Sequence, residues 1–345
     1  MKVSVVILNW NTCALIQQFL PTVVKNSKNP DIQVVVADNG STDDSVAWIK
    51  THHPEVQVIE LGQNLGFAAG YNKALSMINT DFTVLLNSDA APAPNWLPPL
   101  ITAMEQNPQA AACVPVIKDY YQPDFFEYAG AAGGYIDKYG YPFCRGRLFD
   151  KAEKDSGQYQ QPGSIFWGSG AALVVRTQLF VASGGLDPDF FAHMEEIDWC
   201  WRVKNQGHQI IYVPESQVFH LGGGTLSYQN PNKTYLNFRN NLFLILKNQP
   251  GYSAYLILCL RFLLDFLAML NFAVHQEWRN VLAVSRAHRQ FCLQLRKYLK
   301  KRRQLMPLVI QQKHPEIYKG SVVWDFFGKG KTKFSQLNFN PAKTD

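Results

Sequence analysis

Four apolar runs, each followed by residues with helical spacing, constrain the fold of this 345-residue chain more than any other feature. They are rich in β-branched residues and occupy residues 3–10, 32–40, 56–64 and 82–89, as in VSVVILNW and FTVLLNSD. Their nearly unbroken apolar character is typical of strands covered on both faces of a parallel sheet. We therefore expect an α/β fold with a Rossmann-like, mostly parallel sheet and helices on both faces.

Each of these runs ends in polar residues. Ligands of open α/β sheets bind in the crevice outside the carboxyl ends of the strands, so we expect the four strand ends to share one site. Taken alone, an acid such as Asp89 could equally serve only the turn that follows its strand. The polar residues at the strand ends are Asn9 and Asn11, Asp38 and Asn39, Asn64, and Asn87, Ser88 and Asp89.

A group of three acids in MEEIDW is the second chemical signal. Glu195, Glu196 and Asp198 fall within four residues, and Glu195 and Asp198 would share one face of a helix. Crowded carboxylates repel one another unless a cation or a raised pKa relieves them, which is common at reaction centres. A helix that presents its acids to solvent is the alternative, but the neighbouring Trp199 and Trp201 disfavour full exposure.

His220 is the third signal, because it ends the predicted strand SQVFH and precedes three glycines at 222–224. Backbone N–H groups of such a glycine segment suit a phosphate. Asp89 and His220 could share a divalent ion with nucleotide phosphates. Mg²⁺ or Mn²⁺ would suit that site, since substrate oxygens complete the coordination sphere.

The composition of the rest of the chain indicates where the domain boundaries lie. Residues 119–162 are rich in Gly, Tyr, Phe and Pro, and we expect irregular or short β structure there that could shape an acceptor site. After Asn230 the apolar spacing is helical to about residue 304. We expect a catalytic domain over 1–230, a helical extension over 231–304 and a weakly ordered tail over 305–345.

The helical extension combines an apolar segment with a basic one. Residues 252–274 are apolar on nearly all sides, but Arg261 and Asp265 interrupt the run, which favours a buried or interfacial helix over a spanning one. Residues 285–304 carry eight Lys and Arg, and no acid lies between Trp278 and Pro315. This segment suits an anionic membrane surface, with a solvated basic helix as the alternative; no nucleic-acid recognition module accompanies it.

Cysteine usage and the N-terminus bear on the compartment. The six cysteines are scattered without a C-x-x-C pair, which indicates thiols in a reducing environment. The first apolar run is too short and too soon interrupted for a signal peptide. We expect a cytoplasmic protein, with peripheral contact to the inner face of the membrane as an option.

The ordered motifs VSVVILNWN, VVVADNGSTDDS, NLGFAAGYN, LLNSDA, GGLDPDFFAHMEEIDWCWR and HLGGGT resemble those of family-2 glycosyltransferases with the GT-A fold. The resemblance covers about residues 1–250 and is closest to the bacterial rhamnosyltransferase-like and galactofuranosyltransferase-like branch. It implies an inverting, metal-dependent enzyme that uses a nucleotide-diphosphate sugar.

The resemblance also implies roles for single residues. Asp38 would accept the N3–H of a pyrimidine with the Asn9 region at the other edge of the base, and Asp89 and His220 would bind the metal. Glu196 stands where the family usually has an aspartate base, and Glu195 and Asp198 remain alternatives. Asn87 stands where many relatives have a first Asp, so its contact could be ribose, diphosphate or metal. Further donor contacts are expected from Asn11, Asn39, Asn64, Gly66, Asn72 and Ser88, and sugar or acceptor contacts from Trp167, Gly168 and Trp199, whose tryptophans could equally be core residues.

We therefore expect a rhamnosyltransferase-like hexosyltransferase. It would move a sugar from dTDP-rhamnose or a UDP-sugar to a hydroxyl of a glycan or lipid-linked acceptor in cell-surface polysaccharide synthesis, by direct displacement with a carboxylate base and Mg²⁺ or Mn²⁺. A nucleotidyltransferase or dinucleotide enzyme is less favoured, because NWNTCAL and not G-x-G-x-x-G follows the first strand. A non-catalytic sugar-binding protein should lack the acids, yet Asp89, Glu196 and His220 are present.

Overall fold

The computed structural model describes residues 2–127, 130–222 and 231–340. Its main sheet begins with four parallel strands in the spatial order β4-β1-β2-β3. These strands coincide with the four apolar runs, so the expected α/β fold is confirmed, and the expected parallel pairing holds for this part of the sheet. Their bounds are β1 Val3–Asn9, β2 Ile32–Asp38, β3 Gln57–Glu60 and β4 Phe82–Leu86.

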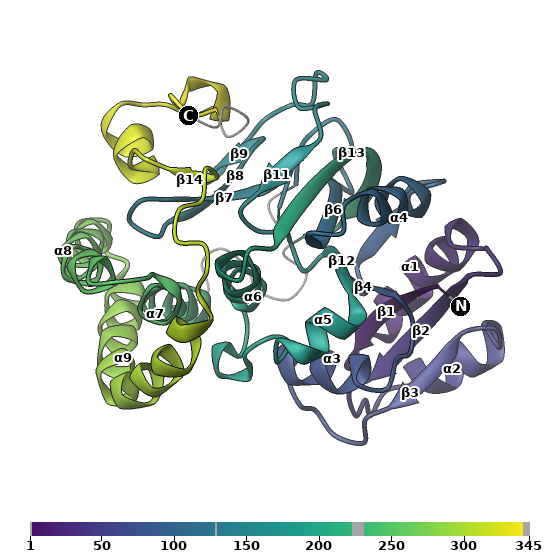
Figure 1. Cartoon of the computed structure of the whole chain (residues 1–345). Helices are drawn as coiled ribbons and strands as arrows, with labels where there is room; N and C mark the ends of the chain where they lie inside the picture. Colours follow the sequence, from purple (N-terminus) through teal and green to yellow (C-terminus); the bar gives the residue numbers. More distant parts are fainter. Residues whose placement is uncertain (1, 128–129, 223–230, 341–345) are drawn as a thin grey trace.

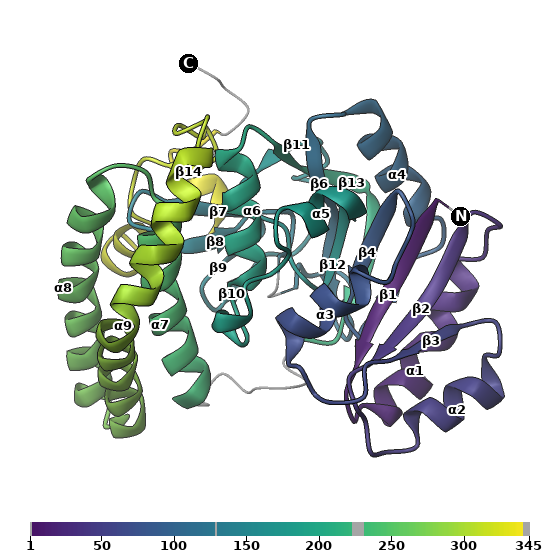
Figure 2. The same ribbon diagram turned by 60° about the horizontal axis from the view of Figure 1, so that its bottom comes forward.

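Helices cover both faces of this sheet (Figures 1 and 2). Side chains alternate along β1, where Val5 and Ile7 face one core and Val6 faces the other. The first core is closed by α1 (Cys13–Asn26), α2 (Ser45–His52) and α4 (Leu97–Gln106), and the second by α3 (Phe67–Leu75), α5 (Thr177–Ala182) and α6 (Glu195–Asn205).

Beyond β4 the sheet becomes mixed. Strand β12 (Ala172–Arg176) is antiparallel to β4, and β6 (Ala110–Asp119), β13 (Gln209–His220) and β11 (Gly163–Ile165) follow in that order. The short β5 (Ala90–Pro92) leaves the turn after β4 and pairs antiparallel with the end of β13. This pairing aligns His220 with Ala90 and so brings the end of β13 beside the turn that contains Asp89.

A second, smaller sheet contains part of the segment 119–162, for which we expected irregular or short β structure. Its order is β10-β9-β8-β7-β14, and β14 comes from the C-terminal tail and pairs in parallel with β7. The strands are β7 Gly134–Asp137, β8 Pro142–Cys144, β9 Arg147–Leu148, β10 Lys151–Ala152 and β14 Ile317–Tyr318.

The expectation of a weakly ordered tail is wrong for residues 306–340. Beyond β14, Val322, Phe334 and Leu337 are buried, and Phe334 and Phe339 pack on Tyr135 and Phe143 of the second sheet. Aromatic side chains bury large areas without any periodic pattern, so the sequence carried no helix or strand signal for this packing. Short helical turns complete the tail at Met306–Leu308, Trp324–Gly328 and Phe334–Gln336.

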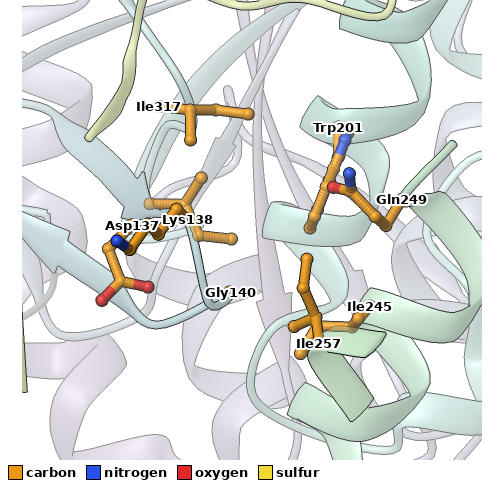
Figure 3. Close-up of a pocket in the computed structure, with 9 residues that line it drawn as sticks. Asp137, Lys138, Gly140, Trp201, Ile245, Gln249, Ile257 and Ile317 are labelled. Carbon is orange, nitrogen blue, oxygen red and sulfur yellow. The ribbon is translucent and has the colours of Figure 1, made fainter. Parts of the chain in front are cut away.

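Three long helices lie at the end of the molecule opposite β1–β3 (Figure 2). They are α7 (Pro231–Asn248), α8 (Ser253–Val274) and α9 (Trp278–Leu305), and Phe243 of α7 stacks on Tyr298 of α9 at 3.7 Å between ring centroids. A pocket where this bundle meets α6 and β7 is lined by four isoleucines, Trp201 and four other residues, and none of its lining residues is an expected site residue (Figure 3). We interpret it as a packing gap.

Candidate active site

The turn after β4 and the end of β13 form the centre of the candidate site. Asp89 Oδ1 lies 3.0 Å from His220 Nε2, and the amide nitrogen of Asn87 lies 3.2 Å from the same ring nitrogen. Leu221 also donates its backbone N–H to the carbonyl oxygen of Asp89. The structure therefore places the two expected metal ligands in contact, with Asn87 beside them.

Glu127 is a member of this cluster that the sequence analysis missed. Its Oε2 lies 3.2 Å from His220 Nδ1, on the side of the ring opposite Asp89, and Glu127 and His220 are both buried. Burial lowers the pKa of His220, but Asp89 and Glu127 more than reverse this effect and raise it to about 10. One feature of the sequence could have drawn attention to Glu127, which is the only charged residue between positions 125 and 136.

Gly222 is required by this arrangement. Its φ is +61°, and a Cβ at this position would lie 2.4 Å from Glu127 Oε1. A side chain there would be strained and would also displace the carboxylate that faces His220. Gly223 and Gly224, which we expected to assist phosphate binding, lie outside the described residues.

The Asp89–His220 pair fits a small divalent cation that displaces the proton held between the two side chains, because a histidine binds metal only in its neutral form. Two neighbouring ligands of an octahedral ion bound at about 2.1 Å are about 3.0 Å apart, which matches the separation of Asp89 Oδ1 and His220 Nε2. Over residues 2–127, 130–222 and 231–340, no group of three or more His, Cys, Asp and Glu side chains is placed to hold a metal by itself. A cation here would need oxygens from a bound nucleotide.

At the ends of β1 and β2, the side chains of Asn9 and Asp38 are hydrogen-bonded to each other. Asn9 Nδ2 donates to Asp38 Oδ1 at 2.9 Å, and the backbone N–H of Ser41 donates to Asp38 Oδ2 at 3.0 Å. Asn11 accepts the N–H of Thr42 at 2.8 Å and so joins the two loops. Each carboxylate oxygen has a second lone pair, so Asp38 can still accept an N–H from a base.

Asn39 and Asn72 hold loops in place through their amides. Asn39 donates to Asn64 Oδ1 and to the carbonyl of Gly66, and it accepts the N–H of Leu65, which shapes the turn before α3. Asn72 donates to the carbonyl of Leu186 at 2.7 Å and accepts its N–H at 2.8 Å. These contacts attach α3 to the segment that precedes α6, a positioning role that the sequence did not predict.

Asp198 is not free to act as a base, which corrects its place among the candidates. It is fully buried, with Oδ2 2.7 Å from Lys247 Nζ and 3.0 Å from Arg202 Nε, and Oδ1 accepts from Asn248 at 2.8 Å. Lys247 also pairs with Asp187, and Lys301 of α9 pairs with Asp187 and Asp189. Asp198 therefore belongs to a network that joins α6 to α7 and α9.

Glu195 and Glu196 differ from Asp198 in lacking such partners. Among the described residues, Oε2 of each glutamate is buried without a hydrogen-bond partner. Burial, and after it the charge of Glu196, raise the pKa of Glu195 well above its usual range. Burial also raises the pKa of Glu196, to about 7, and Glu196 retains partial exposure. Only Glu196 is suited to exchange a proton near neutral pH.

Glu196 is linked to the His220 cluster by an electrostatic effect on one buried thiol, that of Cys144. Burial raises the pKa of the Cys144 thiol, and the nearby charges of both Glu127 and Glu196 raise it further. Both carboxylates are therefore within electrostatic range of Cys144, and Glu127 contacts His220 directly.

The turn before α6 is strained and is held from α7. Phe191, His193 and Met194 all have positive φ, so α6 begins only at Glu195. Asn240 of α7 donates to the carbonyls of Phe190, Ala192 and His193. The position of Glu196 therefore depends on a residue of the helical extension.

The residues expected to contact sugar or acceptor lie in the core, which corrects that prediction. Trp199 is fully buried and donates to Ser183, and Trp167 is 7% exposed and donates to the carbonyl of Tyr135. A Cβ on Gly168 would lie 2.4 Å from Val114, so this glycine serves close packing. None of the three presents a face on which a sugar could stack.

Residues 4–171 match the protein family described as Glycosyl transferase family 2. N-acetylglucosaminyl-diphospho-decaprenol L-rhamnosyltransferase of Mycobacterium tuberculosis is 27% identical over 223 residues, which cover 59% of this chain and 71% of that protein. The pre-mycofactocin glycosyltransferase of the same organism is 26% identical over 198 residues, which cover 55% of this chain and 37% of its own length.

Two solved structures are similar at low sequence identity. GalNAc-T7 with UDP, GalNAc and Mn²⁺ has a TM-score of 0.56 at 17% identity, covering 73% of this chain and 49% of that one. This chain thus spans about half the length of GalNAc-T7. Mannosyltransferase PcManGT from Pyrobaculum calidifontis, with GDP-Man and Mn²⁺, has a TM-score of 0.53 at 16% identity, covering 90% and 86%. Similarity at this level shows a common fold.

Proposed function

We propose that this chain, which belongs to glycosyl transferase family 2 and has the GT-A fold, is an inverting transferase of rhamnosyl or similar hexosyl groups. The donor would be dTDP-rhamnose or a UDP-sugar, and the acceptor a hydroxyl of a glycan or lipid-linked glycan in cell-surface polysaccharide synthesis. The observations that carry the proposal are the Asp89–His220 contact and a Glu196 whose pKa is raised and whose Oε2 has no hydrogen-bond partner among the described residues.

Donor binding would use the strand ends. Asp38 would accept the N3–H of a pyrimidine base, with Asn9 fixing its carboxylate. Asp89 and His220 would hold Mg²⁺ or Mn²⁺, with Asn87 and Ser88 close to the diphosphate or ribose. When bound, such an ion would neutralise the charge that develops on the departing diphosphate.

Glu196 would be the base. It would take the proton of the acceptor hydroxyl as that oxygen forms a bond to the anomeric carbon and the bond to the diphosphate oxygen breaks. A single displacement of this kind inverts the anomeric configuration. Positioned bases contribute about 10²–10⁴-fold to such rates, and a pKa of about 7 leaves Glu196 largely able to accept a proton above neutral pH.

The acceptor and location follow from the relatives. The mycobacterial relative is named for a rhamnosyl transfer to a diphospho-decaprenol-linked sugar, and by analogy we propose a lipid-linked acceptor. Such a substrate is presented at a membrane, so we propose that the enzyme works on the cytoplasmic side.

Nucleotide release tests this proposal. The full chain should release free dTDP from dTDP-rhamnose, or UDP from a UDP-sugar, with Mn²⁺ and far more slowly with EDTA. Asp89→Asn should abolish the metal response. Release of inorganic pyrophosphate in place of a nucleoside diphosphate would instead indicate a nucleotidyltransferase, and no nucleotide binding at all would indicate a non-catalytic protein.

A further inference from the structure

The outward face of α8 is an apolar surface that the rest of the chain does not cover. Among the described residues, α8 is the one helix long and apolar enough to cross a membrane, and only 17% of its most apolar window is buried. The exposed side chains recur at helical spacing along one face, which contains no charged residue: Leu256, Leu263, Phe266, Leu267, Leu270 and Val274.

The two charges of α8 lie on its other side. Arg261 and Asp265 are buried and pair with each other at 3.2 Å. Arg261 also bonds Asn241 of α7 and lies over the Tyr141 ring, while Asp265 lies 3.0 Å from His288 of α9. The charges that interrupt the apolar run in the sequence therefore leave the exposed face continuous.

The neighbouring helix α9 adds further apolar groups and positive charge. Trp278, Leu282 and Leu293 are exposed. The same helical face carries four exposed basic residues spaced by seven, four and three positions: Arg289, Arg296, Lys300 and Arg303. No acid occurs in α9. An apolar strip beside a basic one is complementary to a bilayer that contains anionic lipid.

The inner contacts of α8 favour a helix that lies on the bilayer over one that crosses it. Insertion into hydrocarbon would separate α8 from α7 and α9 and would leave Arg261 and Asp265 without Asn241 and His288. Buried charges that lose their partners are strongly unfavourable. A flat orientation keeps these contacts and buries only the face that is already exposed.

We propose that the outer faces of α8 and α9 form a peripheral binding surface for an anionic membrane. The surface itself follows from exposure and charge. Its purpose, which is to bring the active site to a lipid-linked acceptor, rests on the proposed function.

Vesicle co-sedimentation of the full chain tests the surface. The protein should bind vesicles of phosphatidylcholine mixed with phosphatidylglycerol and should bind pure phosphatidylcholine much less. Leu263→Glu combined with Leu270→Glu should abolish binding. The matched control, Met77→Glu combined with Val181→Glu, changes two exposed apolar residues elsewhere and should bind like the unmodified protein.

The basic strip is tested separately. Arg289→Gln, Arg296→Gln and Lys300→Gln should each weaken binding about fivefold at low salt, and added salt should remove the difference. Thermal melting of every variant should match the unmodified chain, because all these side chains are exposed.

Three results would overturn the proposal: equal binding by the Leu263/Leu270 variant, a dimer that this variant converts to monomer, or protein that alkaline carbonate fails to extract from vesicles. The second would assign the face to another copy of the chain, and the third to a spanning helix. Metal-dependent nucleotide release in solution should be unaffected by these variants, so failure of the membrane surface and failure of the proposed function are distinguishable.

Discussion

Helix α6 presents two different carboxylates only two residues apart. Asp198 has both oxygens bonded to cationic or amide groups of α6 and α7, whereas Glu196 has an oxygen with no partner among the described residues and a raised pKa. Buried polar groups are normally satisfied, so an unsatisfied acid calls for an explanation, and a catalytic role is one of those available. The comparison favours a structural role for Asp198 and a catalytic role for Glu196.

The largest expected effect comes from Glu196→Gln. The amide keeps the size of the side chain but cannot accept the proton, so transfer should fall by about 10²–10⁴-fold with the fold intact. Steady-state transfer rates and thermal melting measure the two consequences. Glu195→Gln is the matched control and should change the rate little, since Glu195 is the more deeply buried of the two glutamates and burial raises its pKa well above the usual range. If Glu195→Gln were the inactive variant, the roles would be exchanged.

Asp198→Asn should affect stability more than chemistry. It leaves Lys247 and Arg202 buried without their shared carboxylate, which should cost about 3–5 kcal/mol in the free energy of unfolding. Asp189→Asn, in a partly exposed member of the same network, should cost about 1 kcal/mol or less. Urea unfolding measures both. An inactive Asp198→Asn protein with unchanged stability would contradict the assignment.

Glu127→Gln tests whether the second carboxylate on His220 assists metal binding. Outer partners of histidine ligands typically contribute about 10–100-fold to metal affinity, so Mn²⁺ binding with a nucleoside diphosphate should weaken by that factor in calorimetry. Glu153 is a comparably buried glutamate that bonds Tyr159 and Phe334 instead. Glu153→Gln should leave the Mn²⁺ affinity unchanged, and an equal loss in both variants would refute a specific role for Glu127.

The smallest expected effect is on the pH profile. Because burial raises the pKa of Glu196 to about 7, its neutral form persists to higher pH than for an ordinary glutamate. The base is then lost as the pH falls, and the transfer rate should drop about tenfold per pH unit below 7. A rate that stays level down to pH 5 would exclude Glu196 as the titrating base. The residual activity of Glu196→Gln should show no such decrease as the pH falls below 7.

Much of the fold was predictable from local patterns, because buried parallel strands and their polar ends have a distinctive composition. The contact of Asp89 with His220 follows from strand ends that meet at one edge of a sheet. The spacing of the acids in the sequence could not distinguish the structural role of Asp198 from the proposed catalytic role of Glu196. That difference depends on Lys247 and Asn248, which belong to a helix distant in the sequence. Glu127 and the packed tail were missed for a similar reason, since their partners come from remote segments without a periodic signal.

The most direct test of the account is the anomalous scattering of Mn²⁺ in a crystal of the chain grown with MnCl₂ and UDP or dTDP. The account predicts one strong peak within bonding distance of Asp89 Oδ1 and His220 Nε2, with the diphosphate oxygens completing the shell and Glu196 facing the donor site. A peak at other residues, or a nucleotide bound away from the ends of β4 and β13, would contradict it.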